Sequence, residues 1–186
     1  MTRAHEPRRE VLVAQRVHDA RVTLVDYDPA WPDIYERAAA RVRGALGDRA
    51  VVLEHVGSTS VPGMAAKPVV DIVLGVWDPA AEEEYVPALA AIGYVLHARE
   101  PEYDEHRLLK PTDGRTKLHV FAAGSAEAGR LICFRDRLRS SRADFELYLA
   151  TKRDLAARTW QYKQDYADAK GAVVEEILRR AKEVGR

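Results

Sequence analysis

Residues 51–76 constrain the fold more than any other stretch, because two strand-forming segments flank a loop rich in glycine and hydroxyl groups. Residues 51–56 are largely apolar and β-branched, which predicts a strand. Residues 69–76 predict a second, largely buried strand that carries a single carboxylate, Asp71. Burial of an unpaired charge is costly, so Asp71 needs a metal, a basic side chain or N–H donors as a partner.

The loop between these strands can offer backbone N–H groups and the hydroxyls of residues 58–60 to an anion. Asp71 can offer oxygens to a divalent cation beside it. An anion cradle beside such a carboxylate is the arrangement that phosphoryl and nucleotidyl transfer require. Ordinary turn chemistry between two strands also explains Ser, Thr, Pro and Gly here, and that alternative stays open.

The segment EHVGSTSVPGMAAKPVVDIVLGV, residues 54–76, resembles the signature of the GrpB family. The similarity covers roughly residues 20–183 and continues at residues 27–32, 118–120 and 134–136, at Tyr148 with Lys152, and at Tyr166 with Lys170. The resemblance implies the nucleotidyltransferase (polymerase-β-like) fold. Some members are fused to dephospho-CoA kinase, which implies a functional link to CoA metabolism.

The composition of the chain limits the class of protein that it can be. The 186 residues suit one domain, and 47% hydrophobic with 31% charged residues permits a packed core. A formal net charge of zero offers no general attraction for nucleic acid, which is therefore not an expected substrate. The single cysteine, Cys133, excludes an intramolecular disulfide and a cysteine-based metal cluster. No apolar run is long enough for a membrane span and the first residues are not a secretory signal, so we expect a cytoplasmic protein without a membrane partner.

Periodicity and turn signals place the other elements. The apolar spacing after Pro32 predicts a helix that ends at Gly47, and three amphipathic helices are expected from Ser125 onward, the third carrying Tyr162 to Ala181. Lys117, His119 and Phe121 share one face of the second hairpin strand. The remaining expected elements are a strand at 21–26, a helix at 80–92, a strand at 94–97 and a hairpin of residues 105–110 and 116–121.

Strands followed by a block of helices predict an α+β fold with a mixed sheet. With the resemblance, this becomes a nucleotidyltransferase-like sheet flanked by helices and followed by a C-terminal helical subdomain. We divide the chain into an N-terminal arm (1–19), the α/β core (20–124) and the helical subdomain packed on it (125–186), together one GrpB-type domain.

By the resemblance, Gly57, Ser58 and Thr59 contact nucleotide phosphates, and a tight turn is the alternative. Lys67 can neutralise a phosphate or pair with a surface acid. Arg135, Lys152 and Lys170 can line a cleft that faces the loop, or they can be solvated residues with acidic partners. The sequence specifies no oligomeric state.

Asp71 matches the first carboxylate of the superfamily's Asp-x-Asp pair, whose members share a metal because residues i and i+2 of a strand face the same side. Position 73 is Val, so replacement ligands would have to come from Glu54, His55, His106 or His119. We predict Asp71 and His119 as catalytic residues and Asp71, His119 and Glu54 as metal ligands. A structural histidine is the alternative for His119. A metal shared by Asp71 and His119 would suit Mn²⁺, Zn²⁺ or Fe²⁺ better than Mg²⁺.

Two functions follow. The first is a transferase that uses Mg²⁺ or Mn²⁺ to transfer a nucleotide from a nucleoside triphosphate to a small-molecule acceptor. The second is a non-catalytic nucleotide- or CoA-type ligand-binding module of the same fold. Val73 favours the second, whereas Asp71 and the loop favour the first. The chain has no G-x-x-x-x-G-K-[ST] segment, so it is not itself a P-loop kinase.

Overall fold

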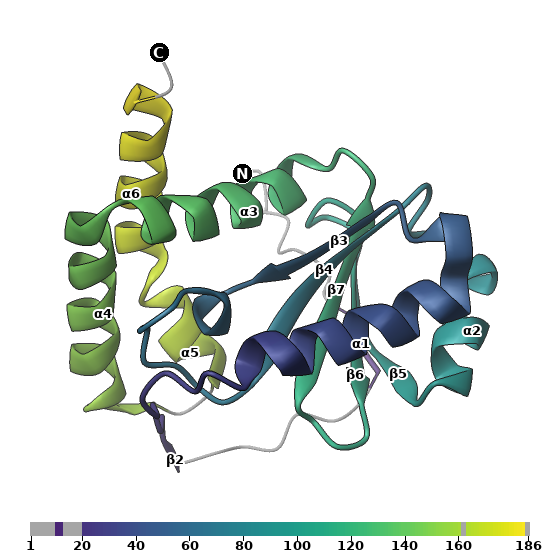
Figure 1. Cartoon of the computed structure of the whole chain (residues 1–186), viewed down its shortest axis with the longest axis horizontal. Helices are drawn as coiled ribbons and strands as arrows, with labels where there is room; N and C mark the ends of the chain where they lie inside the picture. Colours follow the sequence, from purple (N-terminus) through teal and green to yellow (C-terminus); the bar gives the residue numbers. More distant parts are fainter. Residues whose placement is uncertain (1–9, 13–19, 161–162, 185–186) are drawn as a thin grey trace, which may run out of the picture.

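The protein is built on a six-stranded mixed sheet, seen in a computed structural model that describes residues 10–12, 20–160 and 163–184 (Figure 1). The strand order is β1-β5-β6-β7-β4-β3, and every neighbouring pair is antiparallel except β4 and β7, which are parallel. The strands are β1 (Glu10–Val11), β3 (Val52–Val56), β4 (Val70–Val76), β5 (Tyr94–Glu100), β6 (His106–Pro111) and β7 (Thr116–Ala122). This confirms the expected mixed sheet.

One face of the sheet is covered by α1 (Trp31–Leu46) and α2 (Val86–Ala91). Trp31 and Val42 of α1 are buried against Ile72 and Leu74 of β4 and Leu118 of β7. Trp31 is therefore a core residue, and the helical spacing after Pro32 predicted α1 and its end at Gly47 correctly.

The opposite face of the sheet packs against α3 (Ala126–Ser140). Val56, Val73 and Phe121 form the sheet side of this contact, and Ala128 lies opposite them on α3. The Ser125 side chain caps α3 by accepting a hydrogen bond from the Ala128 N–H. Val73, two residues after Asp71, is thus a core residue.

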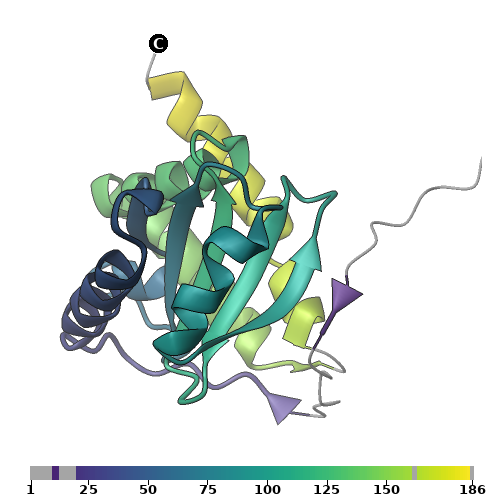
Figure 2. The ribbon, with the colours of Figure 1, turned by 90° about the vertical axis from the view of Figure 1, so that its right-hand side faces the viewer.

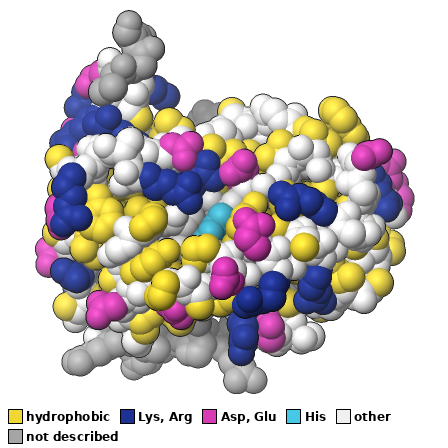
Figure 3. Space-filling model, viewed as in Figure 1, with side chains coloured by type: hydrophobic (Ala, Val, Ile, Leu, Met, Phe, Trp, Pro, Cys, Tyr) yellow, Lys and Arg dark blue, Asp and Glu magenta, His cyan; other side chains and the backbone are white. Residues whose placement is uncertain are grey.

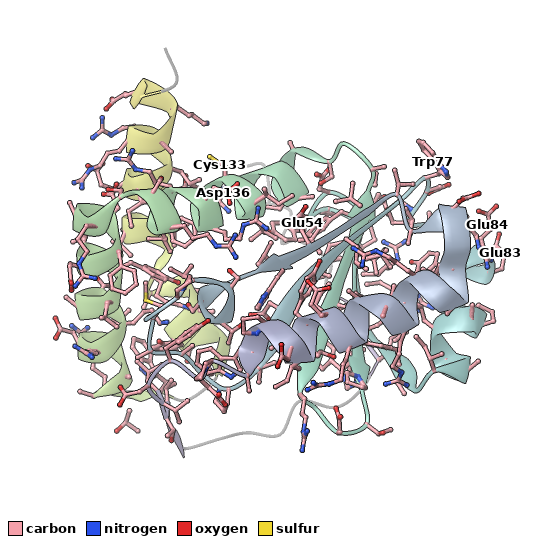
Figure 4. The ribbon with its side chains drawn as sticks, viewed as in Figure 1. Glu54, Trp77, Glu83, Glu84, Cys133 and Asp136 are labelled. Atoms are coloured by element: carbon pink, nitrogen blue, oxygen red, sulfur yellow. The ribbon has the colours of Figure 1, made fainter. Side chains whose placement is uncertain are left out.

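Three C-terminal helices gather at one end of the sheet, on the left of Figure 1: α4 (Arg142–Ala156), α5 (Lys163–Asp168) and α6 (Gly171–Val184). Phe145, Tyr148 and Ile177 pack on Val61 and Met64 of the loop that follows β3. Trp77, Glu83 and Glu84 lie at the opposite end of the molecule (Figure 4). The helices therefore hold the glycine- and hydroxyl-rich loop against the sheet end.

The expected strand at 21–26 is wrong. Within this segment, Val25 forms an isolated β-bridge to Ala66. The loop before β4, which carries Ala66, does not continue this pairing into a strand ladder. The first residue of the expected strand belongs to β2 (Ala20–Arg21), which pairs with β8 (Thr159–Trp160) in a separate small sheet. Within the segment expected as an arm, β1 pairs with β5 and forms an edge of the sheet (Figure 2); residues 1–9 and 13–19 lie outside the described part.

Two helix predictions also need correction. The helix expected at 80–92 is a 3-10 turn, Glu82–Glu84, followed by the shorter α2, because Pro87 is tolerated only in the first turn of a helix. The third C-terminal helix is two helices, α5 and α6, separated by a turn at residues 169 and 170. Tyr162 lies outside the described residues. No helix in the described ranges is long and apolar enough to cross a membrane.

Candidate functional site

Asp71 lies where β3 ends and β4 and β7 begin. It stands opposite Val56 of β3 on one side and Lys117 of β7 on the other. The Lys117 Nζ is 3.8 Å and the His119 Nε2 is 3.4 Å from Asp71 Oδ1. The structure therefore brings together Asp71 and His119, as the sequence predicted, and supplies the basic partners that the carboxylate needs.

The electrostatic surroundings keep Asp71 ionised. Burial alone would raise the pKa of its carboxyl, but Lys117 and His119 outweigh burial and lower the pKa to about 2. Lys170 acts in the same direction. The site thus holds a stable negative charge that is balanced by neighbouring cations.

Gly57 brings the loop backbone against this carboxylate. Its φ is 70°, a left-handed conformation that favours glycine. A Cβ at this position would lie 2.7 Å from Asp71 Oδ2. Residues Ser58–Ser60 then form a 3-10 turn, in which the Ser60 Oγ donates to the Gly57 carbonyl at 2.5 Å.

The two predicted phosphate-binding hydroxyls point to different surroundings. The buried Thr59 Oγ1 lies 3.0 Å from His55 Nε2, so this hydroxyl is held by the protein interior. Ser58 instead lies within hydrogen-bonding reach of the Tyr148 hydroxyl. Ser58 is therefore the hydroxyl of the pair that faces the helical side of the site.

Four lysines from separate elements group near Asp71. Lys117, Lys152 and Lys170 interact electrostatically with its carboxylate, and Lys67 lies close to Lys152. We call the four the lysine cluster: Lys67, Lys117, Lys152 and Lys170. The Lys67 Nζ and Lys170 Nζ lie 4.4 Å and 4.7 Å from the centroid of the Tyr166 ring. Basic and acidic side chains are mixed over the face seen in Figure 3, in keeping with a net charge of zero. The lysine cluster is thus a local grouping of basic side chains in a protein without net charge.

Lys152 and Lys170 are disfavoured as cations in this environment. Burial, then the charges of Lys170 and Lys67, lower the pKa of Lys152 to about 7, although Asp71 opposes the shift. Burial likewise lowers the pKa of Lys170, and Asp71 again opposes it. Asp168 also acts on Lys170 and opposes the shift. Because burial still disfavours the charged forms of Lys152 and Lys170, an added anion beside them would stabilise the site.

The Tyr166 hydroxyl adds an unused polar group. Tyr166 is 2% exposed, and its hydroxyl is the one buried side-chain polar atom without a hydrogen-bond partner within the described residues. Burial raises the pKa of this tyrosine, so the hydroxyl keeps its proton and remains a donor. An unsatisfied buried donor is costly and calls for an explanation.

A chain of side chains supports His119 from the far side. The Glu100 Oε2 lies 2.6 Å from His106 Nδ1, and the His106 Nε2 lies 3.0 Å from His119 Nδ1. The two imidazoles are stacked with their centroids 5.2 Å apart. This chain fixes the ring of His119 so that its Nε2 faces Asp71.

Glu54 and Arg135 belong to a different group of contacts. The Arg135 Nη1 donates to Glu54 Oε2 at 2.6 Å and to the His55 carbonyl at 2.9 Å, and its Nε donates to Asp136 Oδ1 at 2.8 Å. Asp136 lies on α3, and Glu54 lies on β3 beneath that helix (Figure 4). Among the predicted phosphate-binding bases, the structure therefore brings Lys67, Lys152 and Lys170 together, whereas Arg135 is engaged by two carboxylates.

The observed donors do not fit a divalent metal as they stand. Over the described ranges, no group of three or more His, Cys, Asp or Glu side chains could hold a metal ion. Asp71 is contacted by Lys117 and His119, and Glu54 is paired with Arg135. We therefore derive no chemical step through a metal here.

Sequence reasoning paired Tyr166 with Lys170 but did not single out Lys117 or Glu100 as site groups. Lys117 and His119 were expected on one strand face, but only the parallel register of β4 and β7 places Lys117 beside Asp71. No local signal identifies Glu100, because its contact with His106 depends on the register of β5 and β6.

Comparisons with known proteins agree with this architecture. A UPF0157 protein of Halalkalibacterium halodurans is 48% identical over 180 residues, which cover 96% of this chain and 92% of the relative. The crystal structure of the conserved protein GrpB from Enterococcus faecalis superposes with a TM-score of 0.72 at 28% identity, covering 88% of this chain and all of the other. A dephospho-CoA kinase of Mycolicibacterium paratuberculosis is 43% identical over 86 residues, which are 45% of this chain and 21% of the kinase.

Fold and site together define a class: α/β proteins with a mixed sheet and a lysine-rich site at the sheet end beside a glycine- and hydroxyl-containing loop. A family model described as GrpB protein matches residues 21–180. The chain belongs to the GrpB family.

Proposed function

We propose that this protein binds a phosphorylated small molecule of the nucleotide or CoA type at the lysine cluster, without requiring a metal. The observation that carries this proposal is the grouping of four lysines, two of them buried with lowered pKa values, close to Asp71, Gly57 and Ser58. Such a grouping of basic side chains in a partly buried site is stabilised by an anion of more than one charge.

The geometry supports phosphate as the anionic group. Lysine ammonium groups bind phosphate as point charges through charge-assisted hydrogen bonds. Ser58 and Tyr166 add hydroxyl donors on the helical side of the site. In this arrangement Asp71 acts as the counter-ion of Lys117 when no ligand is bound, and the ligand competes with it for the lysines.

The CoA type is included because a relative whose name is dephospho-CoA kinase shares 43% identity with part of this chain. CoA and nucleotides carry the same kind of phosphorylated adenosine or nucleoside group, so one site chemistry can serve both. The comparison of these ligands is part of the test below.

The second candidate is a nucleotidyltransferase that uses Mg²⁺ or Mn²⁺, a nucleoside triphosphate and a small-molecule acceptor. The close approach of Gly57 to Asp71 favours it, because that approach would bring a phosphate on the loop near the carboxylate. Under this candidate, a metal would have to replace Lys117 and His119 as the partners of Asp71.

Calorimetry separates the two candidates. ATP, GTP, CTP, UTP and CoA are titrated into the wild type and Asp71→Asn, either with EDTA or with Mg²⁺ or Mn²⁺. Our proposal expects binding in EDTA that becomes tighter in Asp71→Asn, because a repelling carboxylate has been removed. The nucleotidyltransferase candidate expects metal-dependent binding that Asp71→Asn abolishes.

Asp136→Asn is the matched control, because this exposed carboxylate is paired with Arg135 and lies outside the lysine cluster. It should leave the affinity close to that of the wild type. Absence of binding by all five ligands in EDTA would overturn the proposed function.

A further inference from the structure

Lys152 is a deeply buried lysine that lacks a carboxylate partner. The side chain lies on α4 with the residue 2% exposed, and its Nζ donates to the Ala65 carbonyl at 2.5 Å. Across the part of the chain that the structure describes, no salt bridge includes Lys152. Lysines this deeply buried are ordinarily paired with an anion, so the usual partner of this amine is missing.

The charged and titratable groups that act on Lys152 come from several elements. Tyr148 lies on its own helix, Lys67 on the loop before β4, Asp71 on β4, and Lys170 between α5 and α6. Two of these groups are cations, and Asp71 already has Lys117 and His119 as close partners. The surroundings therefore disfavour the charged form of Lys152 until another negative charge enters.

The unpaired Tyr166 hydroxyl belongs to the same neighbourhood. Its ring is contacted by the Lys67 and Lys170 ammonium groups. Burial, together with electrostatic interactions with Tyr166 and Asp71, raises the pKa of Tyr148, whose ring lies 5.4 Å from the Lys152 Nζ. Tyr166, with its buried unpaired hydroxyl, and the buried Lys152 amine thus share Lys67 and Lys170 as neighbours.

We propose that Lys152 and Tyr166 form the subsite for a terminal phosphate dianion, and that Lys152 takes up one proton from solvent when this phosphate binds. The inference rests on the proposed function and specifies which charge state of the ligand the site selects. The proton balance is simple: the neutral amine gains a proton from solvent and becomes the ammonium that pairs with the phosphate. No other covalent bond changes.

The lowered pKa of Lys152 determines the pH at which its proton uptake can be measured. With a pKa near 7, the Lys152 amine is mostly neutral at pH 8 when no ligand is bound. A dianion beside it favours the ammonium form and raises its pKa. A phosphate diester carries a single negative charge and shifts this equilibrium less.

The test is isothermal titration calorimetry of ATP at pH 8 in EDTA, in buffers with different ionisation enthalpies. The dependence of the observed heat on buffer gives the number of protons taken up. We expect close to one proton for the wild type. Lys152→Met should abolish the uptake and weaken ATP binding at least tenfold, whereas Tyr166→Phe should weaken binding and retain the uptake.

Lys117→Met provides the matched comparison. Lys117 belongs to the lysine cluster but is 40% exposed, so its removal should weaken binding without removing the proton uptake. Lys152→Arg keeps a permanent charge and should bind ATP without uptake. It serves in place of Lys152→Met if circular dichroism shows that the methionine variant is unfolded.

Each outcome decides a specific claim. ATP binding by the wild type without proton uptake would overturn this inference and leave the proposed function standing. Uptake that persists in folded Lys152→Met or Lys152→Arg would assign the proton to another group and overturn it as well. Absence of ATP, nucleotide and CoA binding in EDTA would remove both the inference and the proposed function.

Discussion

The backbone of Gly57 lies so close to Asp71 that a Cβ at position 57 would stand 2.7 Å from the carboxylate Oδ2. Real Cβ atoms do not approach an oxygen this closely, so any side chain here must displace either the loop or Asp71. The loop that carries Ser58 and the carboxylate that holds Lys117 are therefore coupled in space. Changes in one of them should be detected at the other.

Gly57→Ala should destabilise the protein by about 2 to 4 kcal/mol. An alanine is strained in the left-handed backbone conformation of this position, and its Cβ would also lie too close to Asp71. Gly63→Ala is the control: its φ is 78°, but its Cβ would meet its nearest neighbour, Phe145, at an ordinary 3.8 Å. Urea denaturation should show a clearly larger loss for position 57. Equal losses would mean that the contact with Asp71 costs nothing.

The Asp71→Asn variant should be less stable than the wild type, mainly above pH 4. The folded-state pKa of Asp71 is about 2 against a reference of 3.8, so ionised Asp71 stabilises the folded state above that reference. This contribution disappears as the pH falls toward 2. We expect a difference between wild type and Asp71→Asn of about 1 to 2 kcal/mol at pH 6 that narrows steadily below pH 4. A difference that stays constant down to pH 2 would contradict the assigned role of Lys117 and His119.

Lys152 should make the protein more stable as the pH rises from about 7 toward 10. Because its pKa is lowered in the folded state, the unfolded chain binds more protons in this range, and stability therefore increases with pH. Lys152→Met should reduce the slope by up to about 1.4 kcal/mol per pH unit. The free energy of unfolding, measured in urea at several pH values, checks this.

The control for that series is Lys182→Met, which changes an exposed lysine on α6. Its slope should match that of the wild type. A Lys152→Met slope equal to that of the wild type would show that Lys152 is fully protonated in the folded state throughout this range.

Arg135→Met should destabilise the protein by about 2 to 3 kcal/mol, since it leaves Glu54 and the His55 carbonyl without their shared donor. Glu54→Gln should cost less, and the double variant should cost less than the sum of the two. Ligand affinity in folded Arg135→Met should stay within a few-fold of the wild type. A large loss of affinity with unchanged stability would instead support the sequence-based assignment of Arg135 to phosphate binding.

Local sequence pattern was sufficient for the parts of the fold that depend on neighbours along the chain. The spacing of apolar residues after Pro32 predicted α1, and the segment around Gly57 predicted the unit of β3, loop and β4. The separation of α5 from α6 was missed because amphipathic spacing continues across the turn at residues 169 and 170. Pro87 could have indicated the late start of α2.

The candidate site was predictable only where residue type and family pattern coincide. Asp71, Lys152 and Lys170 were identified in this way, and they do share one site. The place of Lys117 depends on the parallel register of β4 and β7, whose strands are far apart in sequence. The inward orientation of the Thr59 hydroxyl likewise depends on its contact with His55. The spacing of apolar residues in the sequence does not predict that contact.

The lysine cluster draws its members from residue 67 to residue 170. During translation, a chain that has left the ribosome only as far as residue 160 carries Asp71, Lys67, Lys117 and Lys152 but neither Tyr166 nor Lys170. The subsite proposed for the terminal phosphate is completed only when α5, which carries Tyr166, has been synthesised. Ligand recognition is therefore among the last properties that the growing chain acquires, so a phosphorylated metabolite would act on finished molecules and not on the nascent sheet.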